Sequence, residues 1–411
     1  IDSENEVTYE WTKQGSDEVI STEKTLKVDE AGVYALVVTD QASFCSSEAS
    51  LFTVTMNKRT PIVSDFVSTN SQDETAEGYK ETTVITCNDT ELFIKSTIVD
   101  NNGVEYTSDE LTFDWTYSED GELFEEYDTN ATISTTTTGI FKLIVTDKET
   151  GCVSVGKVIE ITENKRTPVI SSITSATAED VNAEGYKETT VITCNNPEVF
   201  INSSIKDNNG VEYAAEELTY DWTVSYDNGE IFEEYSSEAT ISTKEAAIFK
   251  LIATDKVTGC TSVQALITIT ENKRTPVVES LVSATSLDET VEGYKETQII
   301  NCKDTELFIK STIVDNVAVG YSPEELTYDW TYSEDGELFE AYGTGETIST
   351  INKGVFRLVV TDKETGCTSV ANTIEIIENK KTPVISMIES VTTIDPAAEE
   401  VVKTSELTCE Y

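Results

Sequence analysis

The chain has 411 residues and carries 77 acidic against 28 basic side chains, a formal net charge of −49. Such a surface repels nucleic-acid phosphates and anionic membranes, which argues against a nucleic-acid partner. The sequence contains no histidine, the commonest general base and metal ligand, and no apolar run of the roughly 18 to 20 residues that span a bilayer. Neither an enzyme nor a protein that inserts directly into a membrane is expected.

Internal repetition defines the domains. Pro61, Pro168, Pro276 and Pro383 recur at a nearly constant interval, each within KRTP or KKTP. We therefore predict three complete tandem repeats, called here the first, second and third, at 60–166, 167–274 and 275–381. The back part of another repeat occupies 1–59, and the front part of a further one occupies 382–411. The chain is expected to be a piece of a longer protein.

The first repeat, taken in chain order, predicts strands only. They cover 61–68, 82–87, 91–100, 111–118, 122–127, 131–136, 139–147 and 153–162. In 139–147, Phe141, Leu143 and Val145 alternate with other residues, which is the period of a strand with one buried face. Asp120-Gly121 is the kind of dipeptide that closes tight hairpins, and it recurs as Asn228-Gly229 and Asp335-Gly336. No helical stretch separates these strands, so the repeats are predicted to be all-β sandwiches.

A family resemblance follows from these residues. The run at 29–34 is similar to the D-x-x-G-x-Y motif before strand F of immunoglobulin-like domains, and Trp11 lies where such domains bury a tryptophan. Leu36 and Leu143 stand where antibody domains have a cysteine, which here follows in TDKETGC. The combination resembles the PKD-like and immunoglobulin-like repeats of large secreted Bacteroidetes surface proteins of the gliding-motility adhesin type, although the WDFGDG signature of PKD domains is absent.

The eight cysteines alternate between two places in the repeat. Cys87, Cys194, Cys302 and Cys409 precede the second long strand, and Cys45, Cys152, Cys260 and Cys367 follow TDKxTG or its equivalent. Spacing alone allows pairs within repeats or pairs across joints, the latter being Cys45–Cys87, Cys152–Cys194, Cys260–Cys302 and Cys367–Cys409. The resemblance implies the set within repeats, namely Cys87–Cys152, Cys194–Cys260 and Cys302–Cys367, with Cys45 and Cys409 pairing outside this chain. Disulfides imply an oxidising compartment, hence an extracellular location.

Two sets of aromatic residues could lie in the core or contact a ligand, the tryptophans as platforms for sugar stacking. Trp115, Trp222 and Trp330 occur in alternating strands, so we predict that they are core residues. Tyr117, Tyr127 and Tyr332 are candidates for a surface strip that contacts a ligand, since an exposed tyrosine presents both an apolar ring and a hydroxyl group.

The joints carry the positive charge of an otherwise acidic chain. Lys165, Arg166 and Pro168 form one joint, and Lys273, Arg274 and Pro276 form the next. These cations have two interpretations: ordinary solvated charge, or the sharper prediction that they pair with acids of the neighbouring repeat and fix the angle between repeats. The proline holds the preceding residue extended and no Gly/Ser run offers slack, so the array is predicted to be a stiff linear rod.

Calcium is a candidate cofactor. Asp100 and Asn102, with Asp207 and Asn209 in the next repeat, supply the oxygen ligands that calcium prefers. The third repeat loses the second asparagine and the glycine of this run, which favours the alternative of a plain turn. No other cofactor or metal is predicted.

The first function hypothesis is a structural segment of a long, repetitive, secreted cell-surface adhesin or filament: a disulfide-braced stalk that projects an adhesive end. Its partners would be neighbouring repeats of the same chain, with surface polysaccharide, other cells or lateral filament contacts beyond them. The alternatives are a multivalent array that binds polysaccharide or protein, and an accessory region of a secreted hydrolase.

Overall fold

The computed structural model describes residues 6–391, 397, 403 and 405. The chain comprises two compact units. Unit 1 consists of Ile1–Val169, Lys206–Thr219 and Ala253–Ser262, and unit 2 consists of Ile170–Ile205, Tyr220–Ile252 and Val263–Tyr411. In the described part of the chain, none of the short helical turns is long or apolar enough to cross a bilayer.

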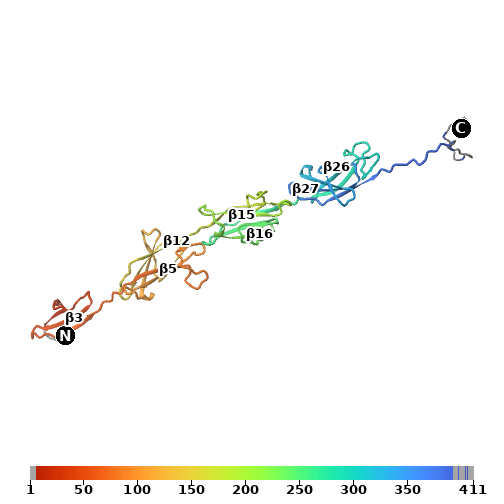
Figure 1. The fold of residues 1–411 in the computed structure, drawn as a ribbon. Coiled ribbons are helices and arrows are strands. Elements are labelled where there is room, and N and C mark those ends of the chain that lie inside the picture. Colours follow the sequence, from red (N-terminus) through yellow and green to blue (C-terminus); the bar gives the residue numbers. More distant parts are fainter. Residues whose placement is uncertain (1–5, 392–396, 398–402, 404, 406–411) are drawn as a thin grey trace. The chain divides into compact units, whose positions relative to one another are not determined.

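The strands before the KRTP run at 58–61 form a single antiparallel sheet with the strand order β2-β1-β3-β4 (Figure 1). Its strands are β1 (Val7–Lys13), β2 (Val19–Ser21), β3 (Gly32–Asp40) and β4 (Ser50–Val54). Trp11, placed on β1 opposite Leu36, donates its indole N–H to the carbonyl of Glu23. These strands lie within 1–59, for which the back part of a repeat is predicted.

The first repeat is a sandwich of a three-stranded sheet, β10-β7-β5, and a five-stranded sheet, β6-β12-β11-β8-β9. Its elements are β5 (Ile62–Thr69), β6 (Val84–Ile85), β7 (Leu92–Val99), η1 (Ser108–Glu110), β8 (Leu111–Ser118), β9 (Glu125–Asp128), β10 (Thr132–Thr135), β11 (Gly139–Asp147) and β12 (Lys157–Glu163). The all-β prediction is confirmed, and η1 is a single 3-10 turn.

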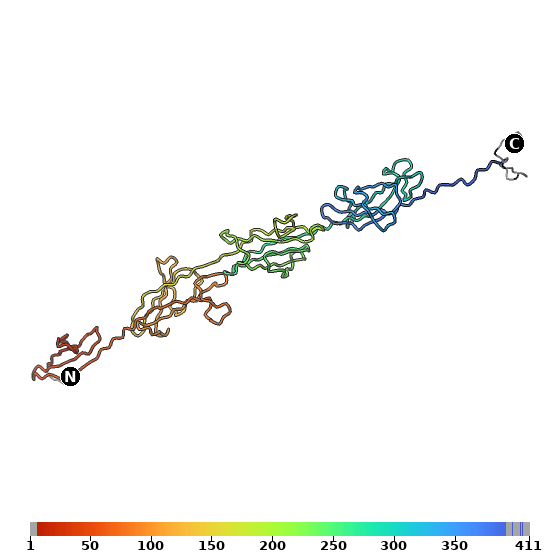
Figure 2. Tube along the Cα trace, viewed as in Figure 1, coloured from red at the N-terminus to blue at the C-terminus, as the bar shows by residue number. Residues whose placement is uncertain are grey.

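The second and third repeats have the same two sheets with the same strand order. Figure 2 follows the Cα trace through these repeats. The second repeat consists of β13 (Pro168–Ala176), β14 (Val191–Ile192), β15 (Val199–Asp207), η2 (Ala215–Glu217), β16 (Leu218–Ser225), β17 (Glu233–Ser236), β18 (Ile241–Thr243), β19 (Ala247–Asp255) and β20 (Ala265–Glu271). The third consists of β21 (Pro276–Ala284), β22 (Ile299–Asn301), β23 (Leu307–Asp315), η3 (Pro323–Glu325), β24 (Leu326–Ser333), β25 (Glu340–Gly343), β26 (Thr347–Thr350), β27 (Gly354–Asp362) and β28 (Asn372–Asn379).

Each repeat has its core around one tryptophan. Trp115, Trp222 and Trp330 are fully buried, as expected of core residues. In the first repeat Trp115 packs with Phe141, Leu143 and Val145, the alternating residues of β11. The Trp115 ring nitrogen donates a hydrogen bond to the carbonyl of Asn130, so the only polar atom of this buried ring is satisfied.

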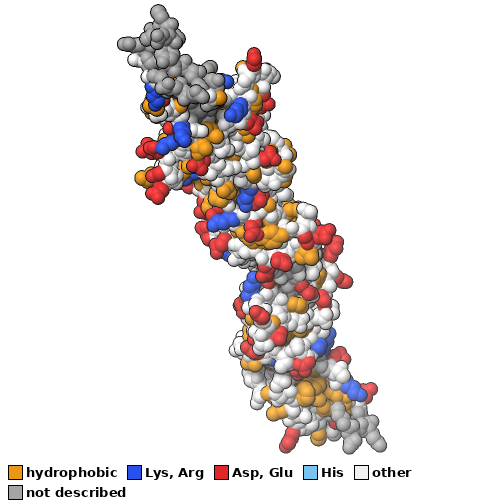
Figure 3. Space-filling view, turned by 90° about the vertical axis from the view of Figure 1, so that its right-hand side faces the viewer, with side chains coloured by type: hydrophobic (Ala, Val, Ile, Leu, Met, Phe, Trp, Pro, Cys, Tyr) orange, Lys and Arg blue, Asp and Glu red, His pale blue; other side chains and the backbone are white. Residues whose placement is uncertain are grey.

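Acidic side chains outnumber basic ones in this chain. In Figure 3, Asp and Glu are spread over the visible face, with fewer Lys and Arg among them. Gly121 has φ of +84° and Gly336 has φ of +83°. They lie within the connections 119–124 and 334–339, which are longer than the predicted tight hairpins because β9 and β25 begin only at Glu125 and Glu340. Residues 382–390 contain no strand, and most of the predicted front part of the further repeat, including Cys409, lies outside the described residues.

Candidate functional site: the joint between repeats

The two cysteines of a repeat lie at opposite ends of its sandwich. Cys87 follows β6, which pairs in parallel with the last residues of β12, Thr162 and Glu163. Cys152 follows β11, which is antiparallel to β12, so it lies beside the start of β12. The length of β12 separates these ends by roughly 20 Å. A disulfide needs Cα atoms closer than about 7 Å, so Cys87 and Cys152 cannot pair.

The structure instead pairs the cysteine before the second long strand of the first and second repeats with the cysteine after TDKxTG in the following repeat. Cys87 bonds to Cys260 and Cys194 bonds to Cys367, both with Cα atoms 5.0 Å apart. The predicted pairs Cys87–Cys152, Cys194–Cys260 and Cys302–Cys367 are therefore wrong. The alternative pairs across joints, such as Cys152–Cys194, are also wrong. The first of the two disulfides lies wholly within unit 1 and the second wholly within unit 2.

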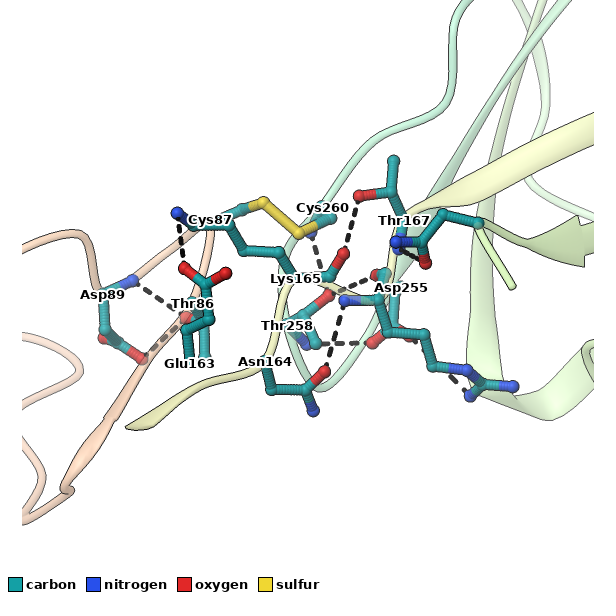
Figure 4. Close-up of a disulfide and its surroundings, with 12 residues drawn as sticks. Thr86, Cys87, Asp89, Glu163, Asn164, Lys165, Thr167, Asp255, Thr258 and Cys260 are labelled. Carbon is teal, nitrogen blue, oxygen red and sulfur yellow. Dashed lines mark hydrogen bonds and ion pairs between the residues drawn. A yellow bond between two sulfur atoms is a disulfide. The ribbon is translucent and has the colours of Figure 1, made fainter. Parts of the chain in front are cut away.

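Two short segments meet at each disulfide. We call residues 86–89 and their equivalents the cysteine turn, and residues 255–260 and their equivalents the acceptor loop. In the turn, the Thr86 N–H donates to the Asp89 carbonyl at 3.0 Å, and the Asp89 N–H donates to the Thr86 hydroxyl. Figure 4 shows the turn and the loop on the two sides of the Cys87–Cys260 bond.

The turn and the loop also form noncovalent contacts. The Asn88 N–H donates to the Thr258 carbonyl at 3.1 Å, and Thr258 is fully buried. A Cβ atom on Gly259 would overlap the Asn88 side chain, and Gly259 has φ of +70°. Glycine is thus required here both by the backbone conformation and by the close approach of the turn.

The second joint repeats these contacts. The Asn195 N–H donates to the Thr365 carbonyl at 3.0 Å, Thr365 is fully buried, and a Cβ on Gly366 would overlap Asn195. Two separate joints with one geometry indicate that the sequence encodes the interface.

Three cysteines in the described part of the chain are free: Cys45, Cys152 and Cys302. Cys152 belongs to an acceptor loop and Cys302 to a cysteine turn, but the chain supplies neither of them with a partner at the separation of 173 found in the two disulfides. The prediction that Cys45 pairs outside this chain stays a prediction.

A partly buried ion-pair cluster anchors the joint arginine to the following repeat. The Arg166 guanidinium contacts Asp207 at 3.2 Å and Glu217 at 2.7 Å. Its carbon lies 3.8 Å from the ring centre of Tyr213. The Thr258 hydroxyl of the acceptor loop donates to the Arg166 carbonyl, so the arginine and the disulfide-bearing loop are connected.

This cluster recurs at the other joints. Arg59 contacts Asp100, Glu110, Tyr106 and Thr150, and Arg274 contacts Asp315, Glu325, Tyr321 and Thr365. The lysines differ: Lys165 pairs with Glu163 and Lys273 with Glu271, each on the strand that precedes the joint. Pairing with the neighbouring repeat is thus a property of the arginines, and the prediction is wrong for these lysines. Pro168 and Pro276 begin β13 and β21.

The two aspartates among the predicted calcium ligands have other partners. Asp207 accepts hydrogen bonds from the N–H groups of Asn209 and Val211, and its second oxygen faces Arg166. Asp100 makes the same contacts with Asn102, Val104 and Arg59. In the described residues no group of three His, Cys, Asp or Glu side chains is arranged to hold a metal ion. These aspartates act as turn formers and as counter-ions of the arginines.

The tyrosines that were candidates for ligand contact take part in packing. The Tyr117 and Tyr127 rings pack against Phe141, and their hydroxyls donate to the carbonyls of Thr138 and Ser134. Tyr332 packs against Phe356 in the same way in the third repeat.

The joint cluster should lose stability in acid. Backbone N–H groups, first that of Val211, and the Arg166 guanidinium hold the pKa of Asp207 below its ordinary value. A carboxylate with a lowered folded-state pKa contributes stability above its unfolded pKa of about 3.9, and this stability is lost as the pH falls through the folded value. Thermal unfolding measured between neutral pH and strong acid should show a constant midpoint down to about pH 4.5, then a fall.

The Asp207→Asn variant provides the control for this experiment. Its midpoint at neutral pH should be lower than that of the native chain, and its fall in acid should be smaller. Equal acid dependence in both proteins would contradict a role for this carboxylate.

Comparison with known proteins gives the following. No protein-family model matches the sequence, and the curated proteins give no match. Among solved structures, a Ca²⁺-stabilised ice-binding adhesin of an Antarctic bacterium is similar at 15% identity, with 91% of this chain and 90% of that chain covered and a TM-score of 0.43. A 1.5-MDa bacterial ice-binding adhesin shows 14% identity, 71% and 91% coverage, and a TM-score of 0.35. Three domains of the outer capsid protein Hoc of bacteriophage RB49 show 14% identity, 70% and 90% coverage, and a TM-score of 0.28.

Proposed function

We propose that this chain is a non-catalytic structural segment of a long, secreted cell-surface adhesin or filament, a stalk whose consecutive repeats are covalently joined. The observation that supports this most is the pair of disulfides, Cys87–Cys260 and Cys194–Cys367, placed identically at successive joints. A disulfide inside a domain stabilises that domain alone. A disulfide between domains holds the joint itself, which is what a spacer under tension needs.

The recurrence of the arginine cluster supports the same proposal. Arg166 and Arg274 each tie the connecting segment to the following repeat through two carboxylates and an aromatic ring. Repetition of one joint favours a spacer, because a binding site needs only one specialised domain. We further propose an extracellular location, since disulfides persist in oxidising compartments, and repeat boundaries at 59/60, 166/167, 274/275 and 381/382.

Single-molecule force spectroscopy tests the proposal. In the oxidised chain pulled from its ends, the shortest covalent path comprises residues 1–87, 194–260 and 367–411, because tension crosses both disulfides. Reduction should therefore lengthen the fully unfolded chain by roughly 700 Å at about 3.4 Å per residue. Equal lengths before and after reduction would contradict the proposal.

Binding measurements separate the stalk from a multivalent binding array. A glycan and surface-protein array probed with the oxidised chain should give no saturable binding. Binding that rises steeply from one repeat to three would favour the array instead, because linked weak sites gain affinity through effective concentration.

A further inference from the structure

The acceptor loop of the first repeat has the conformation of the two occupied loops. Asp147 accepts hydrogen bonds from the N–H groups of Glu149 and Thr150, and the Gly151 N–H donates to the Asp147 carbonyl at 2.8 Å. Asp255 forms the same set in the second repeat, and Asp362 forms it in the third. The loop is thus formed before any partner joins it.

Its exposure is what distinguishes this loop. Thr258 and Cys260, covered by a cysteine turn, are 0% and 1% exposed, whereas Thr150 and Cys152 are only half-buried. A Cβ atom on Gly151 would meet nothing within 4 Å, although Gly151 has φ of +70° like Gly259. The surface that receives Asn88 at the next joint is therefore accessible here.

We propose that the loop at 147–152 is a docking site for the cysteine turn of another copy of this repeat, with Cys152 as the residue that forms the disulfide. The same occupant lies on both equivalent loops in this structure, through a cysteine and an asparagine backbone N–H. The inference rests on the proposed function and names the partner of this surface.

The chemistry is thiol–disulfide exchange. With glutathione disulfide as the oxidant, Cys152 first forms a mixed disulfide and releases one glutathione. The thiolate of the incoming cysteine then attacks the Cys152 sulfur, and the second glutathione leaves as a thiolate that takes up the proton. Two thiols are oxidised and one glutathione disulfide is reduced to two thiols.

The first acceptor-like loop of the chain supplies an internal control. Asp40 accepts from the N–H groups of Ala42 and Ser43, as in the other loops, but Phe44 replaces the glycine and has φ of 58°. The Phe44 side chain stands where an arriving asparagine would pack. Cys45 is therefore an exposed thiol on a similar loop that should not select a cysteine turn.

A peptide with the sequence of residues 83–91, TVITCNDTE, serves as the probe. The oxidised full chain is equilibrated with this peptide, or with a scrambled peptide of the same composition, in a glutathione redox buffer, and the mixed disulfides are quantified by mass spectrometry. Occupancy at Cys152 should be roughly fivefold higher with the native peptide than with the scrambled one, the worth of about one hydrogen bond with its packing. Occupancy at Cys45 should be the same with both peptides.

The Gly151→Asn variant completes the test. Asparagine tolerates a positive φ and its side chain has free space in this loop, so the variant should still fold. The new side chain would fill the place that the incoming Asn88 needs. The preference at Cys152 should disappear. Equal occupancy by both peptides in the native chain, or an unchanged preference in the variant, would overturn the inference.

The same spectra separate this inference from the function beneath it. If the Cys87–Cys260 and Cys194–Cys367 peptides are found but Cys152 shows no preference, the docking site is wrong and the stalk stands. If those two disulfides are absent, both the proposed function and the proposed docking site are wrong.

Discussion

Proteolytic cleavage after Glu184, in the segment that links β13 to β14, should leave the two fragments joined until a reductant is added. The cleavage site would be a protease recognition sequence inserted at this position. Glu184 lies between Cys87 and Cys260, so the disulfide bridges the cut. The equivalent cut after Glu292 is bridged by Cys194–Cys367. The equivalent cut after Glu77 precedes both disulfides and should release the N-terminal fragment at once. Gel electrophoresis under denaturing conditions, with and without reductant, measures all three.

The Cys260→Ser variant should change only one of these results. Its cut after Glu184 should release two fragments without reductant, whereas the cut after Glu292 should still leave the chain joined. The effect is all-or-none, which makes it independent of the stability of the repeats. Disulfides within repeats would not bridge any of the three cleavage sites. If every cut released two fragments from the oxidised native chain, the pairing described above would be wrong.

Reversing the charge of Arg166 should cause the largest loss of stability at a joint. Glutamate at this position would face Asp207 and Glu217, both now counter-ions of the arginine, and would leave the nearly buried Asp207 carboxylate without its cation. Removing one partner of a buried charge pair is strongly destabilising. The lowest thermal transition of the chain should fall by roughly 5 to 10 °C, as measured by calorimetry.

Lys165→Glu is the matched control, because it places the same charge change one residue earlier. Lys165 pairs with Glu163, and both side chains are half exposed, so the change should move the transition by no more than about 2 °C. If the two variants behave alike, net charge rather than the arginine cluster governs the joint.

The strands and the core were predictable because they depend on local pattern. The alternation of Phe141, Leu143 and Val145 specifies one buried face, and the tryptophan of β8 recurs at a fixed place in each such pattern. The turn glycines followed from the need for positive φ. The predicted strand at 82–87 contracts to Val84–Ile85, because the residues after it form the cysteine turn.

The disulfides were not predictable in this way. Which end of a sandwich a cysteine occupies depends on strand register and direction, here the parallel pairing of β6 with the end of β12. Sequence spacing favours the nearest cysteines on either side of Cys87, which are Cys45 and Cys152, over the more distant Cys260. One signal was available in the sequence: an arginine, an aspartate, a tyrosine and a glutamate recur together in each repeat, which indicates a contact around the joint. At the joint between the first and second repeats these are Arg166, Asp207, Tyr213 and Glu217.

The long separation of the bonded cysteines also constrains the order of oxidative maturation. Because the chain is synthesised from its N-terminus, Cys152 is available to react with Cys87 long before Cys260 has been made. The sandwich of the first repeat keeps those two thiols at opposite ends once it has folded. Folding must therefore precede oxidation, and the cysteine of each cysteine turn must stay reduced until the following repeat is complete. A chain oxidised too early would trap non-native loops that only an isomerase or a reductant could release.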